Sequence, residues 1–496
     1  MPHQQKETNC NCGVKQVIHF IDALAGHHKT QHIIEQATSL AGDKEKVLIL
    51  VPTLLLAESV KARIEENMAK RNLTAIINLK AIHHENSGSV VGSIINHINH
   101  EAYPDGEILI LTMAAYDLIN WSHFPHWSQR RHLFIDEIPA VERFYDESLP
   151  QTHPIITDHL VASASPYPNY SYIACPNLEK IRPMARNRNQ DKVWDIFQPL
   201  AHRLGSRHWT NYVNTKHHEE LLAGRTRRLQ VHSIRRRDCF AGWKRLVMAG
   251  ALFRDSPLYL TWRDQVEFVP EMIGSRKHSH GENLTFHYAI PGRMTKRKRK
   301  TLTTGNAGDE SFVTAFARTA AQAMGVANTE VLVLANKGMD DDLFRDAVRL
   351  PNSPHGLNDY QEYRYFVALG AFNQNPVHGA FLAALGLDEL EVWRGIHLQS
   401  IYQGMMRGAL RTEHDIEVHV AVPDQATVRA IAALFPGCDV RRLMGLEAYR
   451  QPEAKAGRPR QWDDDAERMW KTRQKQKLDR ILAEIAALNE RSCDEG

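Results

Sequence analysis

The sequence predicts an α/β protein with two tandem domains built on parallel sheets, a basic insertion in the first domain and a C-terminal helical tail. Short apolar runs alternate with longer amphipathic segments over residues 17–136, and the same alternation returns after residue 284. Alternating strand and helix patterns indicate parallel sheets with helices on both faces. A chain of 496 residues can also bury more than one core.

The strands expected in the first domain are continuous apolar runs, rich in leucine and β-branched residues. Such runs are typical of strands that are covered on both faces, and the amphipathic segments between them are typical of helices. Strands are expected at residues 17–21, 46–52, 74–79, 107–112 and 132–136, with helices beginning near Lys29, Leu54, Ser89 and Ala114.

The second domain repeats the pattern. Strands are expected at residues 284–290, 330–336, 363–372 and 416–424, each separated from the next by a helical pattern. We therefore predict one domain over residues 1–283, a second over 284–449 and a separate tail over 450–496.

Composition sets limits on the class of protein. A net charge of +3 and a pI near 8.4 are mild, so any affinity for a polyanion has to come from local basic patches. The six cysteines form neither a disulfide framework nor a paired Cys-x-x-Cys zinc pattern, which favours a reducing, cytoplasmic location. No apolar run reaches the length of about 20 residues that a membrane span needs.

The stretch FIDALAGHHKTQHIIEQA, residues 20–37, has the features of a phosphate-binding loop between a strand and a helix. Ala23 begins the pattern, Gly26 lies in the turn, and Lys29 and Thr30 close it. In such loops the backbone N–H groups at the helix N-terminus bind phosphates, the lysine neutralises charge and the hydroxyl holds Mg²⁺. The alternative is an ordinary helix start with a solvated lysine.

One residue departs from the pattern, because His28 stands where a second glycine is expected. A glycine there lets the backbone approach the phosphates, and an imidazole could crowd the nucleotide. A negative φ at His28 would point its side chain outward and preserve the loop.

A second motif ends the expected strand at residues 132–136. In RRHLFIDEIPAV, Asp136 and Glu137 lie at the carboxyl end of the strand, the edge at which open α/β sheets bind ligands. The first carboxylate can hold Mg²⁺, and the second can orient and deprotonate a water molecule. Alone, the pair could equally be a solvated turn.

With these motifs the chain resembles the superfamily 2 helicases, the DEAD/DEAH-like ATPases, and most closely the helicase-like proteins of phages and mobile elements. The loop resembles motif I, and FIDEIP resembles motif II, the Walker B box. The resemblance implies two RecA-like domains that bind ATP and Mg²⁺ between them.

Weaker matches follow in the order that the family has. VLILVPTLLLAESV and ILILTMAAYDLI are similar to motif Ia and the next element, which implies that Thr53 and Thr112 contact the nucleic-acid backbone. RLVMAGALFRDSPLY is similar to motif III and EVLVLANKG to motif IV. PHGLNDYQEY resembles motif V, so His355 and Asn358 are candidate nucleic-acid contacts.

Motif VI is represented by YQGMMRGALR. Gln403, Arg407 and Arg411 recur every four residues, so on a helix they would share one face and direct guanidinium groups at a γ-phosphate. The second arginine of the family comes three residues after the first, whereas Arg411 comes four after Arg407, which makes Arg407 the firmer assignment. A solvated basic helix face is the alternative.

Residues 140–245 exceed what two such domains require. This stretch holds 17 Lys and Arg against 10 Asp and Glu, together with Trp194, Trp209 and several tyrosines, a combination suited to tracking a backbone and stacking on bases. A helical decoration with a solvated basic face is the alternative. The run GRMTKRKRK, residues 292–300, is expected to be an exposed loop near the domain junction.

The tail carries GRPR, residues 457–460, which resembles the AT-hook core and makes Arg458 and Arg460 candidate contacts to the minor groove of DNA. Leu478, Ile481, Ile485 and Leu488 then form a short apolar seam, suited to docking on the body of the protein or on a protein partner. The 27 histidines show no metal-binding spacing and are expected to be scattered over the surface.

Together these features predict an ATP-dependent nucleic-acid helicase or translocase, with DNA favoured as the substrate. Two alternatives remain open at this point. One is a nucleic-acid-binding scaffold whose ATP site has lapsed because of His28. The other is a phosphate-loop enzyme that acts on a small molecule, which would leave the motifs of the second domain unexplained.

Overall fold

The computed structural model describes residues 15–82, 89–100, 106–306, 310–327, 330–336, 339, 347–351, 360–412 and 416–451. The chain divides into two compact units, residues 1–300 with 310–447 and residues 301–309 with 448–496. In the second unit, Thr303 and Arg450 pair through backbone hydrogen bonds. His355 and Asn358 of motif V, the GRPR segment with Arg458 and Arg460, and the apolar seam of the tail lie outside the described residues.

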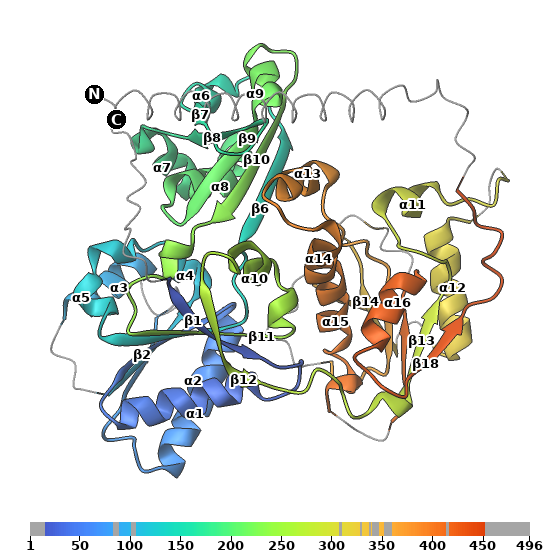
Figure 1. Ribbon diagram of the computed structural model, residues 1–496, viewed down its shortest axis with the longest axis horizontal. Helices are drawn as coiled ribbons and strands as arrows, with labels where there is room; N and C mark the ends of the chain where they lie inside the picture. The colour runs from blue at the N-terminus through green and yellow to red at the C-terminus, as the bar shows by residue number, and fades with distance from the viewer. Residues whose placement is uncertain are drawn as a thin grey trace, which may run out of the picture. The chain divides into compact units, whose positions relative to one another are not determined.

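The first lobe is built on a seven-stranded parallel sheet in the order β12-β1-β11-β5-β2-β4-β3 (Figure 1). Its strands are β1 (Val17–Asp22), β2 (Lys46–Val51), β3 (Asn78–Ala81), β4 (Glu107–Thr112), β5 (Arg131–Asp136), β11 (Arg245–Gly250) and β12 (Glu267–Ile273). Its helices are α1 (Lys29–Gly42), α2 (Leu54–Lys70), α3 (Val90–Asn99), α4 (Met113–Asp117), α5 (Pro125–Ser128) and α10 (Pro257–Trp262), with 3-10 turns η2 (Trp121–His123), η3 (Arg237–Phe240) and η4 (Phe253–Asp255).

The continuous apolar strands are explained by burial on both faces of this sheet. In β2, Val47 and Ile49 pack with α1 and α2, whereas Leu48 and Leu50 face the opposite core with α3 and α4. One predicted strand is misplaced: β3 begins at Asn78 rather than at residue 74, because residues 74–76 form turns. The other predicted strands and helices of this lobe are confirmed.

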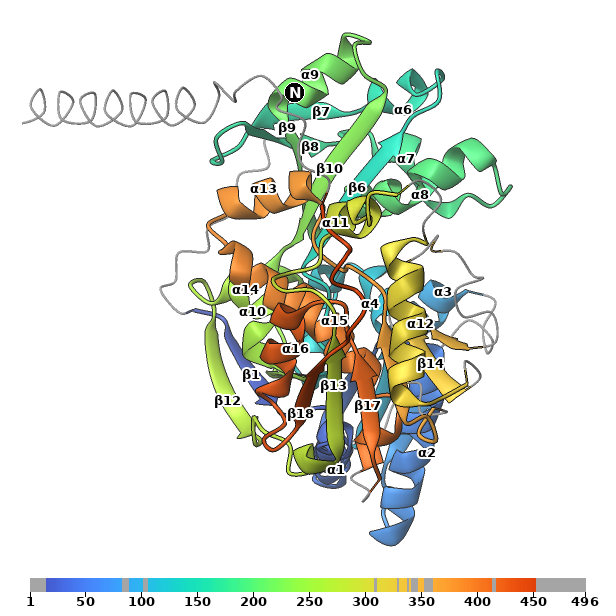
Figure 2. The same ribbon diagram turned by 90° about the vertical axis from the view of Figure 1, so that its right-hand side faces the viewer.

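The second lobe has a six-stranded parallel sheet in the order β15-β14-β16-β17-β13-β18. Figure 2 views this lobe from the side, with α12 and α16 near its strands. The strands are β13 (Leu284–Tyr288), β14 (Val331–Leu334), β15 (Val348–Leu350), β16 (Tyr365–Ala368), β17 (Val418–Ala421) and β18 (Asp439–Arg442). The helices are α11 (Lys296–Thr301), α12 (Phe312–Met324), α13 (Pro376–Ala384), α14 (Glu389–Trp393), α15 (Gln399–Met405) and α16 (Gln425–Ala432), with a π-helical turn η8 (Arg394–Leu398) and a 3-10 turn η9 (Ala409–Thr412).

The two parallel sheets confirm the predicted fold class of tandem α/β domains. The chain passes from the first sheet to the second between Ile273 and Leu284. The basic run at residues 292–300 is mostly exposed, as expected, but it is not all loop, because residues 296–300 belong to the short helix α11. None of the helices in the described ranges combines the length and the apolar character that a membrane span requires.

The insertion lies between β5 and β11 and is an α+β unit, not the helical decoration considered as an alternative. Its antiparallel sheet has the order β6-β10-β9-β8-β7, and α7 and α8 pack on it over a core of their own. The strands are β6 (Glu142–Ser148), β7 (Val161–Ala164), β8 (Tyr170–Ala174), β9 (Trp209–Asn214) and β10 (Arg228–Arg235). The helices are α6 (Pro154–Thr157), α7 (Leu178–Arg186), α8 (Lys192–Gly205) and α9 (Thr215–Leu222).

Part of the basic and aromatic content of the insertion has a structural use, although most of its arginines and lysines are exposed. Arg235 is buried, binds Asp117 through both terminal nitrogens at 2.7 and 2.8 Å, and lies over the ring of Trp209. Arg228 forms a two-pronged ion pair with Asp146. Because ion pairs and aromatic packing take up these side chains, the sequence pattern overstates the surface available for nucleic acid.

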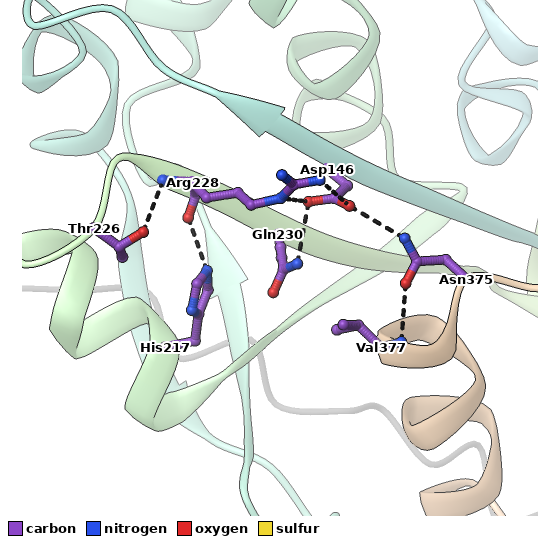
Figure 3. Close-up of polar contacts among 7 residues, drawn as sticks. All are labelled: Asp146, His217, Thr226, Arg228, Gln230, Asn375 and Val377. Carbon is purple, nitrogen blue, oxygen red and sulfur yellow. Dashed lines mark hydrogen bonds and ion pairs between the residues drawn. The ribbon is translucent and has the colours of Figure 1, made fainter. Parts of the chain in front are cut away.

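The insertion also contacts helix α13 of the second lobe. Figure 3 shows Asp146 at the centre of this contact, where it accepts hydrogen bonds from Arg228, Gln230 and Asn375. Asn375 in turn caps α13 by accepting the N–H of Val377 at 2.9 Å. A polar network therefore fastens β6 and β10 to the start of α13.

A buried pair of histidines lies beside this network. The Nδ1 atoms of His232 on β10 and His378 on α13 are 2.8 Å apart, and Nε2 of His378 lies 2.6 Å from the carboxylate of Glu142 on β6. The rings are stacked with Phe144 on one side, and Phe381 packs against His232. This contact joins the insertion to the second lobe through apolar and polar groups together.

The expectation of surface histidines is wrong for nine of those in the described residues, which are buried. They are His97, His132, His208, His218, His232, His278, His287, His378 and His397. Several of these rings stack on aromatic residues, as His397 stacks on Trp393, and others lie beside carboxylate or backbone groups, as His378 lies beside Glu142. Neutral imidazole is amphipathic, so it fills such places where one ring edge can find a polar partner.

The variant His232→Gln tests whether this buried pair influences the pH dependence of stability. Burial, and then the neighbouring His378, holds the pKa of His232 at about 3, below its ordinary value of 6.5. Below pH 6.5, His232 therefore becomes protonated in the unfolded chain but stays neutral in the folded chain. The free energy of unfolding then decreases as the pH falls, by up to about 1.4 kcal/mol per pH unit. We expect urea denaturation to show a shallower loss of stability on acidification in His232→Gln than in the wild type.

The exposed His126 provides the matched control, because His126→Gln makes the same change at a solvated position outside the buried pair. Its stability should follow the wild-type pH dependence. An unchanged slope in His232→Gln would mean that His232 is protonated in the folded protein.

Candidate functional site

The loop predicted to bind phosphate connects β1 to α1. It turns at Gly26, which has a φ of +86°, and the N–H of His27 bonds back to the carbonyl of Leu24 at 3.2 Å. Helix α1 then begins at Lys29, and its first turn contains no acidic residue. The free N–H groups of this helix start, without a nearby carboxylate on the same turn, suit an anion.

His28 takes the left-handed backbone conformation that a glycine would supply. Its φ is +53° and its ψ is +24°, so the negative φ considered from the sequence is not what the structure has. Its side chain is nevertheless exposed. The loop therefore keeps a glycine-like course, at the cost of a conformation that L side chains adopt rarely.

Lys29 is directed back into the loop. Its ammonium group donates to the carbonyls of Ala23 and Leu24 at 3.0 and 2.9 Å. Burial lowers the pKa of this lysine, whereas the nearby carboxylates of Glu137 and Asp136 act in the opposite direction. Two of its three donors are used by the loop, and the cation lies in the field of both carboxylates.

Thr30 connects the loop to the strand that carries motif II. Its hydroxyl donates to Oδ2 of Asp136 at 2.8 Å, across the intervening strand β11 of the sheet. Burial, and then the charge of Glu137, raises the pKa of Asp136 to about 6. A hydroxyl and a buried carboxylate in contact are oxygen donors of the kind that Mg²⁺ prefers.

Glu137 has a strained backbone with a φ of +95°. Its N–H bonds to the carbonyl of Ala249 at 3.2 Å, which extends the pairing of β5 with β11 by one residue. The side chain of Ile138 then passes so close to Gly250 that a Cβ there would lie 2.2 Å from it. Tight packing on β11 therefore fixes the unusual direction of Glu137.

The second lobe brings Arg407 and Arg411 to this loop, but not on one helix face as predicted. Helix α15 ends at Met405, and Arg411 lies in the separate 3-10 turn η9. The helix stops because the chain at Gly408 lies against the carbonyl of Tyr363, which accepts the N–H of Ala409 at 2.9 Å. The four-residue spacing thus does not produce a shared helical face.

Both arginines nevertheless converge on the motifs of the first lobe. A Cβ added to Gly26 would lie 3.4 Å from the carbonyl oxygen of Arg411, so η9 packs directly on the loop. Arg407 is buried, and burial followed by the charge of Arg411 lowers its pKa to about 10, while Glu137 opposes the change. The charge of Glu137 acts to raise the pKa of all three cations, Lys29, Arg407 and Arg411.

Three contributors to the site were missed by the sequence analysis. Tyr402 accepts the N–H of Ala25 at 2.9 Å, from one residue before Gln403. Arg63 on α2 acts electrostatically on Asp136 and on Arg411. Asp22, the last residue of β1, accepts the N–H of Phe253 at 2.9 Å; its position at a strand end was the only available signal.

Other predicted residues lie nearby in structural roles. Gln403 is half-buried on α15. Thr53 lies two residues after β2, and Thr112 is the last residue of the adjacent strand β4. Their hydroxyl oxygens cap α2 and α4 by accepting N–H groups at 3.2 Å. Contact of these threonines with nucleic acid stays a prediction.

Interactions outside the loop also hold the two lobes together. Arg263 after α10 binds Glu391 on α14 through two hydrogen bonds of 2.8 and 3.0 Å. Gln399 donates to the carbonyl of Ala251 at 3.0 Å, and a Cβ at Gly395 would lie 2.3 Å from the carbonyl oxygen of Asp255. The π-helical turn η8, which contains Gly395, thus packs directly against the first lobe.

Comparisons with known proteins give no family model and no curated protein that matches this chain. Solved structures that are similar in fold include an XPD helicase, with a TM-score of 0.44, 11% identity and coverage of 86% of this chain and 96% of that chain. The DUF1998 helicase MrfA bound to DNA and AMPPNP has a TM-score of 0.39 and 10% identity, covering 86% of this chain and 50% of that chain. The DEAD-box helicase Mss116 bound to ssRNA and UDP-BeF has a TM-score of 0.34 and 9% identity, covering 86% and 71%. At these scores the likeness adds nothing on function.

The variant His28→Gly tests the strain in the loop. A glycine takes the observed φ of +53° without steric cost, so we expect the free energy of unfolding to rise by about 1 kcal/mol. Thermal or urea denaturation measures this change. His28→Ala is the control, since alanine keeps a Cβ and should bring no gain. Equal stabilisation by both variants would show that the imidazole, and not the backbone, is unfavourable.

Proposed function

We propose that this protein is an ATP-dependent nucleic-acid helicase or translocase of the superfamily 2 type, which hydrolyses ATP between its two lobes. The observation that supports this most is the convergence of cations from both lobes on one carboxylate. Lys29 of the first lobe and Arg407 and Arg411 of the second all lie within electrostatic reach of Glu137. A site with this charge pattern suits a triphosphate beside a catalytic acidic residue.

Each part of the loop then has a role in binding ATP. The N–H groups at the start of α1, beginning with Lys29 and Thr30, would surround the phosphates, with Ala23, Gly26 and His28 shaping the loop. Lys29 would exchange one of its bonds to Ala23 or Leu24 for a phosphate oxygen. The exchange would cost little free energy, because a charged phosphate oxygen is a stronger hydrogen-bond acceptor than a neutral carbonyl.

The oxygen donors fit a magnesium ion. Thr30 and Asp136, already 2.8 Å apart, would hold Mg²⁺, which supplies charge neutralisation for the phosphates when bound. Because the Asp136 pKa is raised by its burial and by Glu137, a cation at this place would offset an unfavourable buried charge.

The hydrolytic step follows from the remaining groups. Glu137 would orient a water molecule and accept its proton as the water oxygen bonds to the γ-phosphorus and the bond to the ADP oxygen breaks. Arg407, with Arg411 and Gln403 beside it, would stabilise the charge on the transferred phosphoryl group. The strained backbone of Glu137 keeps its carboxylate at the sheet edge that faces these arginines.

Coupling to nucleic acid would use the same sheet edge. Thr53 lies two residues after β2 and Thr112 ends the adjacent strand β4, and the motif V match adds His355 and Asn358 as candidate contacts. DNA is favoured over RNA by the GRPR segment with Arg458 and Arg460, and the seam in the tail is a candidate surface for a protein partner. The likeness to helicase-like proteins of phages and mobile elements is supported by the motifs alone.

A second candidate function is a nucleic-acid-binding scaffold that does not hydrolyse ATP. It is favoured by the histidine in the left-handed position of the loop and by the bonds that hold Lys29 to the loop carbonyls. Binding of nucleic acid without stimulated ATP hydrolysis would support this function.

The variant Glu137→Gln tests the proposed activity. The amide keeps the size of the side chain but cannot accept a proton, so we expect nucleic-acid-stimulated ATP hydrolysis to fall by about 10² to 10⁴, with nucleotide binding retained. Phosphate release, measured with single-stranded DNA, single-stranded RNA and neither, gives the rates.

The matched control for this variant is Glu267→Gln at the exposed start of β12, which should behave like the wild type. A wild-type protein that binds nucleic acid but releases no phosphate would rule out the motor and leave the scaffold. Stimulation by a small metabolite instead of nucleic acid would point to the small-molecule enzyme.

The variant Arg407→Ala tests the contribution of the second lobe. Loss of an arginine that stabilises the transferred phosphoryl group typically lowers kcat by about 10³ or more, with a smaller effect on nucleotide binding. Arg429→Ala on the exposed side of α16 is the control, and kcat for it should be unchanged. If Arg411→Ala lowered kcat and Arg407→Ala did not, the two arginines would exchange their assigned roles.

A further inference from the structure

Tyr402 of the second lobe is hydrogen-bonded to the phosphate-binding loop of the first. It lies on α15, its side chain is fully buried, and its hydroxyl accepts the backbone N–H of Ala25 at 2.9 Å. Tyr402 is the first residue of the motif VI match YQGMMRGALR, but the motif assigned no role to it. The contact is a direct hydrogen bond between the lobes within the loop that runs from β1 to α1.

The same hydroxyl is bonded to the segment that links the lobes. Nε2 of His278, which lies between β12 and β13, is 3.0 Å from the Tyr402 oxygen. Burial, and then the neighbouring His280 and His27, holds the pKa of His278 at about 3, so this imidazole is neutral. A neutral imidazole can accept the phenol proton at Nε2, and Tyr402 can then accept from Ala25 while it donates to His278.

His278 is itself held rigidly between parts of both lobes. Its ring stacks on Phe435 with centroids 4.3 Å apart, and the ring of His27 from the loop approaches it edge-on at 5.4 Å. Its backbone N–H bonds to the carbonyl of Leu434 at 2.8 Å. The acceptor for the Tyr402 proton is therefore fixed in place, which limits the positions that the phenol can take.

The arginine segment is fastened by the same linker. Nε2 of His280 lies 3.0 Å from the carbonyl of Leu410, the residue before Arg411, and the carbonyl of Arg411 lies against Gly26. Tyr402 also lies in the last turn of α15, five residues before Arg407. A change in the position of the Tyr402 hydroxyl would therefore shift the loop relative to both arginines.

We infer that Tyr402 is a positioning residue: its hydroxyl sets the phosphate-binding loop against the arginine segment, so the catalytic groups of the two lobes align only while the Ala25–Tyr402–His278 chain of hydrogen bonds is intact. The inference rests on the proposed function for its kinetic consequence, but the hydrogen bonds themselves do not depend on catalysis. Separation of the lobes has to break the bond to Ala25, and closure has to remake it.

The variant Tyr402→Phe removes one oxygen atom and keeps the ring. We expect kcat for nucleic-acid-stimulated ATP hydrolysis to fall at least about tenfold, because displacement of catalytic groups lowers the rate steeply, with little change in KM for ATP. We also expect faster hydrogen–deuterium exchange in the peptide that spans residues 23–28, because the Ala25 N–H loses its partner.

Tyr116 offers a matched control. It is fully buried in the first lobe, and its hydroxyl donates to the carbonyl of Cys239 at 2.7 Å, so Tyr116→Phe also deletes a buried hydroxyl with one backbone partner. This control should lose a similar amount of stability without a change in kcat or in the exchange of residues 23–28. The variant His278→Phe, which removes the acceptor of the phenol proton, should resemble Tyr402→Phe.

The hydrogen-exchange and kinetic measurements test the role of Tyr402 and the proposed function separately. Unchanged exchange of residues 23–28 in Tyr402→Phe would overturn the inference whatever the enzyme does. An equal loss of kcat in Tyr116→Phe would reduce Tyr402 to a residue of general stability and would also overturn it. A wild-type protein without ATP hydrolysis would remove the proposed function, and the exchange measurement alone would then decide whether Tyr402 holds the loop.

Discussion

The hydrogen bond between Thr30 and Asp136 is the contact on which the arrangement of the site depends. It connects the start of α1 to the end of β5 across the intervening strand β11, so it fixes the phosphate-binding loop relative to the carboxylates. This hydrogen bond is important for stability because the buried carboxylate of Asp136 cannot be solvated by water and needs a hydrogen-bond donor from the protein. The second lobe then approaches a loop whose position is already determined, and Tyr402 binds Ala25 there.

The lobes are joined at two separate places, and this constrains any motion between them. The first is the region around the phosphate-binding loop, together with the nearby ion pair between Arg263 and Glu391. The second is the insertion of the first lobe, which contacts α13 of the second lobe through Asp146, Glu142 and the pair of His232 and His378. A change in the spacing of the lobes must break contacts at both places or carry the insertion along with α13.

Three of the eight non-glycine residues with a positive φ in the described part of the chain lie around the candidate site. His28, Glu137 and Leu252 have φ values of +53°, +95° and +53°, and they follow β1, β5 and β11, the three adjacent strands at the centre of the site. Such conformations persist only where surrounding packing enforces them, as Ile138 over Gly250 does beside Glu137. The strain therefore marks the edge of the sheet at which the loop, the carboxylates and the arginines meet.

The sequence by itself determined the class of fold, because strands buried on two faces must be continuously apolar, and this signal is local. It also located the loop and the Asp136–Glu137 pair, since strand ends can be read from where the apolar runs stop. Tertiary structure alone decided that α15 ends before Arg407, that Arg235 of the insertion is buried against Asp117 and Trp209, and that Tyr402 reaches Ala25. These features depend on contacts between residues far apart in the chain, and residue spacing contains no information about such contacts.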